Sequence, residues 1–200
     1  MISKNSKIFL AGHKGMVGSA IFNRLKKDGY KKIIVVSKKK LNLLNQYKVD
    51  KFLKKIRPKV VIIAAAKVGG ILANKNLKAN FLYENLTIQS NIIHSSYLSG
   101  VKNLIFLGSS CIYPKKTKQP IKESFFMTGP LENTNDAYAI AKITGVKMCM
   151  EYSKQYKLNY KTLMPANMFG ANDNYDLSSS HFFPALIRKI HNAKIRKKKF

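Results

Sequence analysis

Five short apolar runs alternate along the chain with segments whose apolar residues recur at helical spacing. The runs are residues 7–11, 33–36, 60–64, 103–107 and 160–164. Continuous apolar strands of this kind are buried on both faces, and strands that alternate with helices usually pair in parallel. Because crossover connections are right-handed, the pattern predicts an α/β fold with a doubly wound parallel sheet of the Rossmann type.

The segments between and after these runs complete the expected architecture. We expect helices over residues 16–25, 46–56, 80–98, 137–156 and 184–191, a loop over 114–135, and a solvated tail over 194–200. The apolar runs are too short to span a bilayer, and no apolar segment typical of a signal peptide precedes the first of them. We therefore predict a cytoplasmic protein with no membrane partner.

The lysine content is the unusual feature of the composition. The net charge is +28, and only four of the 37 basic residues are arginine. A strongly basic chain is compatible with a nucleic-acid or anionic-membrane binder. The lysines are spread along the whole chain, however, and no nucleic-acid-binding motif accompanies them. We therefore interpret the charge as lysine-biased residue usage and expect no nucleic-acid partner. Cys111 and Cys149 form no metal-ligand or disulfide pattern, so no metal is expected.

A glycine-rich turn lies between the first apolar run and the first helix. Its spacing is G-x-x-G-x-x-G, and its residues, all candidate cofactor contacts, are Gly12, His13, Lys14, Gly15, Met16, Val17 and Gly18. In such a turn the glycines allow a tight bend, close approach of a pyrophosphate, and packing of the helix on the sheet. The strand–turn–helix context makes this motif far more specific than a lone glycine triplet. It predicts a dinucleotide site.

The residues after the second run bear on which dinucleotide is bound. NAD sites usually carry an acidic residue at the end of this strand, where it binds the ribose 2′-hydroxyl. Here the segment 37–40 reads Ser-Lys-Lys-Lys. Lys38 and its neighbours, with Lys14 in the turn, suit a 2′-phosphate instead, so we predict NADP(H) rather than NAD(H).

A Y-x-x-x-K pattern supplies candidate catalytic residues. Tyr138 and Lys142 are four residues apart on a predicted helix and therefore share one face. A nearby cation should lower the tyrosine pKa toward a value useful for proton transfer. Ser109 follows the fourth strand, and ligands of open α/β sheets bind beyond the carboxyl ends of strands. A serine there can hydrogen-bond a substrate carbonyl that the tyrosine protonates, and these residues with the glycine turn form a far more specific combination than Y-x-x-x-K alone.

Several longer segments carry a resemblance to a known family. They are residues 12–18, 64–71 (AAAKVGGI), 108–114 (GSSCIYP), 136–142 (DAYAIAK), 164–170 (MPANMFG) and 180–188 (SHFFPALIR). With them the chain resembles the extended short-chain dehydrogenases and, within these, the GDP-L-fucose synthases, over about residues 7–194. This family carries out NADPH-dependent 3,5-epimerisation and 4-reduction of GDP-4-keto-6-deoxy-D-mannose. Lys14 stands where the family usually has arginine.

The resemblance implies a role for individual residues. Ser109, Tyr138 and Lys142 match the reductase triad, and Cys111 and His181 match the acid and base of the epimerisations. The remaining implied contacts are Leu107, Gly108, Ser109, Ser110, Tyr138, Lys142, Pro165, Ala166, Asn167, Met168 and His181 to the cofactor, and Lys189 to the substrate. Cys149 is interpreted as a packing residue.

The resemblance also implies an organisation into domains. We expect an NADP-binding domain over residues 1–170 and the beginning of an incomplete substrate-binding region over 171–200, because family members continue through a C-terminal substrate domain. It also implies a homodimer built on the long helices. Three alternatives stay open: a related nucleotide-sugar enzyme such as one forming GDP-colitose, a non-catalytic NADP-binding fragment, and a basic nucleic-acid-binding protein.

Overall fold

A computed structural model describes residues 2–196 and contains one parallel sheet. The strands are β1 (Ile8–Ala11), β2 (Ile33–Ile34), β3 (Val60–Ile63), β4 (Asn103–Leu107) and β5 (Asn159–Leu163), in the order β2-β1-β3-β4-β5. Ile8 pairs with both Ile33 and Val60, so β1 lies between β2 and β3. The order changes direction between β1 and β3, which makes this the switch point where ligands of such sheets bind. The predicted doubly wound parallel sheet is confirmed.

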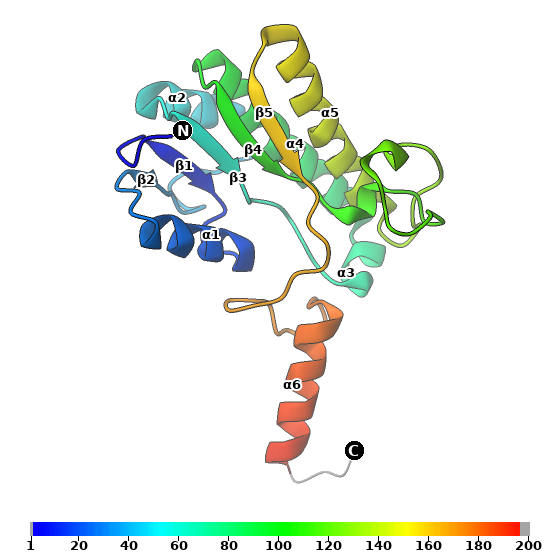
Figure 1. The fold of residues 1–200 in the computed structure, drawn as a ribbon. Helices are drawn as coiled ribbons and strands as arrows, with labels where there is room; N and C mark the ends of the chain where they lie inside the picture. The colour runs from blue at the N-terminus through cyan, green and yellow to red at the C-terminus, as the bar shows by residue number, and fades with distance from the viewer. Residues whose placement is uncertain (1, 197–200) are drawn as a thin grey trace.

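The helices cover both faces of this sheet, except for the third and the last, which lie beyond the carboxyl ends of its strands (Figure 1). They are α1 (Met16–Lys27), α2 (Gln46–Ile56), α3 (Ile71–Asn76), α4 (Lys78–Leu98), α5 (Asp136–Tyr156) and α6 (Phe182–Ile195), with short 3₁₀ turns η1 (Ser110–Ile112) and η2 (Glu123–Phe125). Alternate residues of a strand point to opposite faces, so β1, β2, β3 and β4 contribute to two cores, whereas β5 contributes Tyr160 to one of them.

One core is larger than the other. On one face Phe9, Val61 and Phe106 pack with residues of α2, α4 and α5 such as Leu53 and Ile92, all of them buried. On the opposite face Ile8, Leu10, Val60 and Ile62 pack against the partly buried Ile21, Phe22 and Leu25 of α1, among others. The continuous apolar runs of the sequence follow from this burial on both sides.

Three sequence-based expectations differ from the structure. The second strand is two residues long rather than four, because only Ile33 and Ile34 pair with β1. The short helix α3 was not expected. Lys194 and Ile195 belong to α6 rather than to a solvated tail, and residues 197–200 of that expected tail lie outside the described residues.

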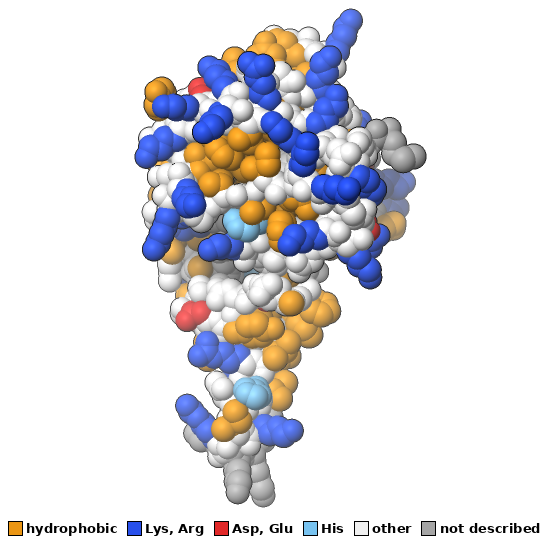
Figure 2. Space-filling view, turned by 90° about the vertical axis from the view of Figure 1, so that its left-hand side faces the viewer, with side chains coloured by type: hydrophobic (Ala, Val, Ile, Leu, Met, Phe, Trp, Pro, Cys, Tyr) orange, Lys and Arg blue, Asp and Glu red, His pale blue; other side chains and the backbone are white. Residues whose placement is uncertain are grey.

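Helix α6 projects away from the body that contains the sheet (Figure 1). Several large apolar side chains on it are exposed, including Phe182 at 79% and Ile195 at 66%. Lysine and arginine side chains are scattered over the face seen in Figure 2, with few acidic ones among them. Within residues 2–196 no helix is long and apolar enough to cross a membrane.

Candidate active site

The glycine turn is shaped by close backbone contacts at its two ends. Gly12 has a φ of +89°, and a Cβ there would lie 2.5 Å from the backbone nitrogen of Ala65. A Cβ on Gly18 would lie 2.0 Å from the carbonyl oxygen of Gly12. Both positions therefore require glycine for the protein's own packing. The turn lies beside the segment that follows β3, at the switch point of the sheet.

Gly15 differs from its two neighbours in the motif. A Cβ there would meet only the carbonyl oxygen of Gly12, at an ordinary 3.6 Å, and the residue is exposed. Protein packing therefore does not explain this glycine, whereas close approach of a ligand does. Gly15 is also the N-cap of α1 and provides no side-chain cap, so the first N–H groups of the helix are available to an anion.

A cavity of about 330 Å³ adjoins the start of α1. Among its lining residues are four that the sequence predicts as cofactor contacts, Met16, Val17, Asn167 and Met168. The structure thus brings the glycine turn and the segment after β5 to one place, although they are about 150 residues apart. Two other predicted contacts, Lys14 and Lys38, are exposed. The pKa of His13 is lowered by burial and by the neighbouring Lys14.

The ends of β4 and β5 are joined beyond the last ladder pair. The N–H of Gly108 donates to the carbonyl oxygen of Leu163 at 2.8 Å, and that of Ser110 donates to the carbonyl oxygen of Pro165 at 3.2 Å. The two strand-end segments predicted to contact a cofactor, residues 107–110 and 165–168, are therefore neighbours. A parallel sheet produces this arrangement because the carboxyl ends of its strands meet at one edge.

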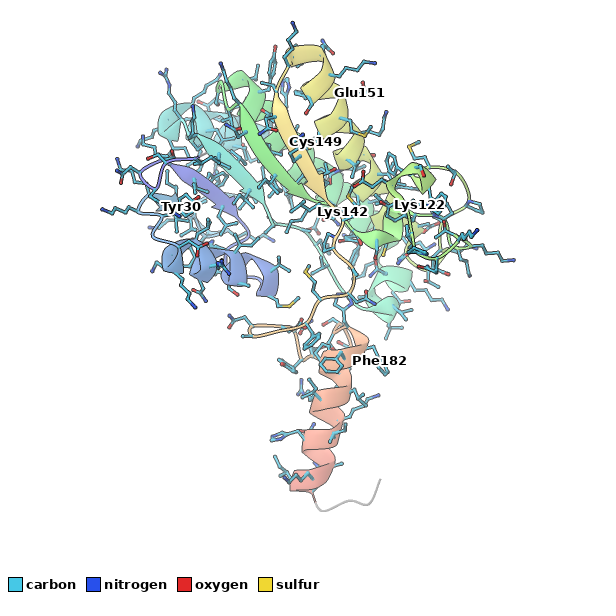
Figure 3. All side chains as sticks on the ribbon, viewed as in Figure 1. Tyr30, Lys122, Lys142, Cys149, Glu151 and Phe182 are labelled. Carbon is cyan, nitrogen blue, oxygen red and sulfur yellow. The ribbon has the colours of Figure 1, made fainter. Side chains whose placement is uncertain are left out.

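Tyr138 and Lys142 lie on α5 against the end of β4. The ammonium nitrogen of Lys142 is 5.7 Å from the centre of the Tyr138 ring and 4.8 Å from the centre of the Phe106 ring. It donates a hydrogen bond to the carbonyl oxygen of Leu107 at 2.8 Å. Figure 3 shows Lys142 near the end of the sheet that faces α3 and α6. Lys142 is only 3% exposed, and this burial lowers its pKa to about 8.

The pKa of Tyr138 is raised, so the expectation that Lys142 would lower it is wrong for this structure. Burial is the main cause, and the neighbouring Cys111 acts in the same direction. A hydrogen bond with the side chain of Ser109 has the opposite, smaller effect. Burial dominates because desolvation penalises the charged phenolate. Tyr138 is therefore a protonated phenol that can donate a proton, with Ser109 beside it.

Cys111 lies in η1, immediately after Ser109 and Ser110. Its N–H donates to the hydroxyl oxygen of Ser109 at 3.3 Å, and the side-chain amide of Asn135 donates to its Sγ at 3.3 Å. The thiol is partly buried. Ser109, Cys111, Tyr138 and Lys142 thus come together at the carboxyl end of β4. The sequence interpretation missed Asn135, whose place just before the Tyr138 helix was the available signal.

His181 and Lys189 belong to a different element from this cluster of four residues. His181 is exposed and is the N-cap of α6, and Lys189 is exposed on that helix. No hydrogen bond joins the two residues of the predicted epimerisation pair, His181 and Cys111, both of which the structure describes. Cys149 is fully buried in the larger core, which agrees with the packing role expected for it.

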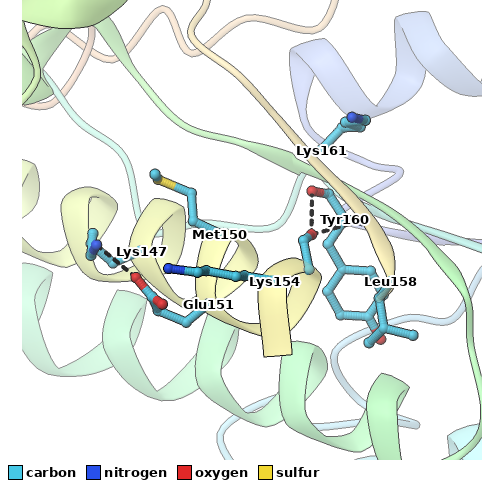
Figure 4. A pocket seen from close by; sticks show the side chains of 8 residues that line it. Lys147, Met150, Glu151, Lys154, Leu158, Tyr160 and Lys161 are labelled. Atoms are coloured by element: carbon cyan, nitrogen blue, oxygen red, sulfur yellow. Dashed lines mark hydrogen bonds and ion pairs between the residues drawn. The ribbon is translucent and has the colours of Figure 1, made fainter. Parts of the chain in front are cut away.

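A second cleft lies away from these residues. A cleft of about 650 Å³ lies between the C-terminal half of α5 and β5 (Figure 4). Its lining includes Lys147, Glu151, Lys154 and Lys161. Lys147 is paired with Glu151 at 2.7 Å. The cleft contains none of the predicted site residues. Among the described residues no group of three or more His, Cys, Asp or Glu side chains could hold a metal.

The sequence matches the NAD dependent epimerase/dehydratase family over residues 8–200. The chain belongs to this family. The family match covers the glycine turn, the strand-end serine and the Y-x-x-x-K helix described above. The fold and the predicted site of this family member therefore lie within one matched region.

Individual relatives are similar over nearly the whole chain. A GDP-L-fucose synthase from Sinorhizobium fredii is 55% identical over 190 residues, which are 95% of this chain and 60% of that protein. One from Escherichia coli is 49% identical over 94% of this chain and 58% of that protein. The crystal structure of a GDP-D-glycero-L-gluco-heptose synthase from Campylobacter jejuni in the presence of NADPH has a TM-score of 0.93 and 42% identity, over 98% of this chain and 57% of that one. This chain therefore spans about 60% of the length of these relatives.

Proposed function

We propose that this chain is the nucleotide-binding part of an NADP(H)-dependent enzyme that converts GDP-4-keto-6-deoxy-D-mannose to GDP-L-fucose. The observation that carries the proposal is the convergence of Ser109, Cys111, Tyr138 and Lys142 at the carboxyl end of β4. The names of the two GDP-L-fucose synthases support the choice of substrate. The domain boundary near residue 170 is part of the same proposal, supported by the extended segment that separates β5 from α6.

The residues of the glycine turn fit a dinucleotide. The open backbone at Gly15 and the uncapped start of α1 would hold the pyrophosphate, and the cavity lined by Met16 and Met168 adjoins them. Lys14 and Lys38 would contact a 2′-phosphate. NADPH supplies the hydride for the reduction at C4. The heptose synthase solved in the presence of NADPH supports this choice of cofactor.

Tyr138 would act as the acid of the reduction. Its raised pKa keeps the phenol protonated at neutral pH, so a proton is available for the C4 keto oxygen as negative charge develops there. The hydroxyl of Ser109 would hold the same oxygen. The ammonium of Lys142 remains charged below a pH of about 8 and adds positive potential beneath the ring.

Cys111 would exchange protons at C3 and C5. Protons next to a keto group are acidic, and a thiolate beside the sugar can remove one. The amide of Asn135 donates to the sulfur and would stabilise a thiolate. His181 would supply the second proton-transfer group, from the segment that leads into α6, and Lys189 would contact the diphosphate.

A related GDP-sugar is the alternative substrate. The Campylobacter jejuni structure, 42% identical, is named for a GDP-heptose rather than for GDP-fucose. GDP-colitose formation would use the same arrangement of residues. A non-catalytic NADP-binding fragment is the remaining alternative, because the chain spans about 60% of its relatives.

We also infer a homodimer formed through α4 and α5. These helices pack against each other, and their exposed apolar residues include Tyr83, Leu98, Ile140 and Met150. Such a surface favours association with a second copy. The cytoplasmic location stays a prediction from the sequence.

The decisive experiment is an NADPH-oxidation assay with GDP-4-keto-6-deoxy-D-mannose, in which product formation is followed by sugar analysis. It should be run on this chain and on a chimera that appends the C-terminal 40% of the Sinorhizobium fredii protein. GDP-L-fucose formed by the chimera and lost with Tyr138→Phe would support the proposal. NADPH oxidation only with another GDP-sugar would favour the alternative substrate.

A further inference from the structure

The turn between β3 and α3 binds the segment that leads into α6. The N–H of Gly70 donates to the carbonyl oxygen of Ser179 at 2.9 Å. A Cβ on Gly70 would lie only 2.1 Å from the carbonyl oxygen of Ser180 and 3.7 Å from the nitrogen of His181. The two backbones are therefore in direct contact although they are about 110 residues apart in sequence. Glycine at position 70 is what permits this approach.

Asn74 fixes the shape of this turn from within α3. Its side-chain amide donates to the carbonyl oxygens of Gly69 at 2.6 Å and of Gly70 at 3.1 Å. The residue is 8% exposed. The exposed faces of α3 carry Ile71 and Leu72, so apolar burial contributes little to holding the turn. The polar bonds of Asn74 thus constrain the α3 end of the turn, while Asn85 binds the N–H and the carbonyl oxygen of Lys67 nearer β3.

The same turn is linked to the catalytic tyrosine. A Cβ on Gly69 would lie 3.2 Å from Cζ of Phe81 and 3.5 Å from the carbonyl oxygen of Ser179. The Phe81 ring is 2% exposed and meets the Tyr138 ring edge-on, with centroids 6.4 Å apart. A continuous series of contacts therefore runs from Tyr138 through Phe81 and the β3–α3 turn to the residues just before His181.

We propose that Gly70 and Asn74 are positioning residues that hold His181 at the active site by binding the 179–180 backbone to the β3–α3 turn. This inference rests on the proposed function, because it assigns His181 to the epimerisation. His181 is exposed and begins a helix that projects from the body, so its own side chain has little to fix its place. The contacts of the preceding two residues with the β3–α3 turn constrain where it lies, beside the packing of Phe183 on Phe169.

Two variants remove the constraint in different ways. Gly70→Ala places a methyl group against the carbonyl oxygen of Ser180 and forces the two backbones apart. Asn74→Asp keeps the side-chain shape but replaces the donor by a carboxylate that repels the carbonyl oxygens of Gly69 and Gly70. The matched controls are Asn76→Asp, on the exposed end of the same helix, and Gly170→Ala, whose Cβ would meet only the Met16 side chain at 3.7 Å.

The position of His181 can be measured without substrate. A nitroxide attached to Cys111 should be selective, because Cys149 is fully buried. Its relaxation enhancement of the His181 ring protons is read by NMR in the 200-residue chain. The chain has four histidines, so a His181→Gln variant assigns the signal. We expect strong enhancement in the parent chain and both controls, and a several-fold decrease in Gly70→Ala and Asn74→Asp that retain the parent circular dichroism.

A functional measurement distinguishes positioning from general destabilisation. In the chimera described above, both variants should slow solvent-deuterium incorporation at C3 and C5 several-fold more than they weaken NADPH binding. Unchanged relaxation enhancement in a folded Asn74→Asp chain would overturn the inference, as would an equal loss in Asn76→Asp. Absence of deuterium incorporation in the parent chimera would instead count against the proposed function alone, since the relaxation measurement needs no catalysis.

Discussion

The ammonium nitrogen of Lys142 lies 2.8 Å from the carbonyl oxygen of Leu107, to which it donates a hydrogen bond, and this pairing buries a cation at the end of β4. The carbonyl satisfies one donor but supplies no opposite charge. Burial therefore lowers the pKa of Lys142 from 10.5 to about 8. Keeping Lys142 protonated in this buried place lowers the free energy of unfolding, so we infer that the lysine is placed there for function rather than for stability.

The burial of Lys142 predicts how the stability of the fold changes with pH. The unfolded chain keeps the Lys142 proton up to about pH 10.5, whereas the folded chain releases it near pH 8. Unfolding in this interval takes up a proton, so raising the pH stabilises the fold, by about 1 kcal/mol between pH 8 and 9. Above pH 9 the buried Cys149, whose pKa burial raises to about 12, acts in the opposite direction.

Lys142→Met should remove that dependence. At pH 7 the variant should be more stable than the parent by up to about 3 kcal/mol, because an uncompensated buried charge is gone. Urea denaturation from pH 7 to 9 measures both effects. Lys147→Met, at a partly exposed position on the same helix, is the control and should keep the parental slope. A parental slope in Lys142→Met would show that another group titrates there.

Substitution by alanine should have different effects at Gly18 and at Gly15 of the glycine turn. Gly18→Ala places a Cβ 2.0 Å from the carbonyl oxygen of Gly12 and should destabilise the fold by about 1–3 kcal/mol. Gly15→Ala meets no such contact and should fold normally, yet weaken NADP(H) binding. Thermal unfolding and calorimetric titration of both variants measure the two effects. Unaltered cofactor binding by Gly15→Ala would contradict the assigned role of this open backbone.

How well the sequence predicts an element of this fold depends on which interactions stabilise that element. The bounds of β4 and α2 were predicted correctly because burial in the sheet and core determines them. Helix α3 was missed because it has no periodic apolar face: Ile71 and Leu72 are exposed, and Asn74 anchors it through polar bonds. Such long-range polar contacts leave no periodic signal.

The candidate site likewise has some features that the sequence predicts and others that it does not. The strand-end rule places Ser109 at the ligand-binding edge of the sheet, and helical spacing places Tyr138 beside Lys142; both follow from the sequence. The direction of the Tyr138 pKa shift does not, because it depends on how completely the ring is buried, with Phe81 packed against it. Spacing locates the lysine but cannot reveal that its partner is the carbonyl of Leu107.

Cofactor preference tests the basic residues near the expected adenosine site. NADPH should bind about tenfold more tightly than NADH, because a 2′-phosphate gains charge-assisted hydrogen bonds from Lys14 and Lys38. Lys38→Glu should reduce this preference, whereas Lys102→Glu, an exposed lysine at the amino-terminal end of β4, should not. Calorimetry with both nucleotides measures the ratio. Equal affinities in the parent chain would overturn the assignment.

The two halves of the proposed chemistry should separate by mutation. In the chimera, Tyr138→Phe should abolish hydride transfer, since no phenol protonates the C4 oxygen, yet leave deuterium incorporation at C3 and C5. Cys111→Ala should slow incorporation first. Mass spectrometry of the sugar in D₂O, beside NADPH oxidation, measures both. If the two variants lost incorporation equally, the division of roles between Tyr138 and Cys111 would be wrong.

The last prediction concerns the 200-residue chain by itself. It should bind NADP(H) weakly and show little turnover. The glycine turn and the Ser109–Tyr138–Lys142 group lie in the body, whereas Lys189, the proposed substrate contact, lies on the projecting helix α6. Binding energy from the remote guanosine and diphosphate orients the keto-sugar. Weak binding of these two groups therefore lowers turnover as well as substrate affinity. The apolar side chains exposed on α6, such as Phe182 and Ile195, also favour self-association. Light scattering and a steady-state rate at saturating NADPH measure these outcomes. A monodisperse chain as fast as the chimera would show that residues 1–200 already hold the complete substrate site.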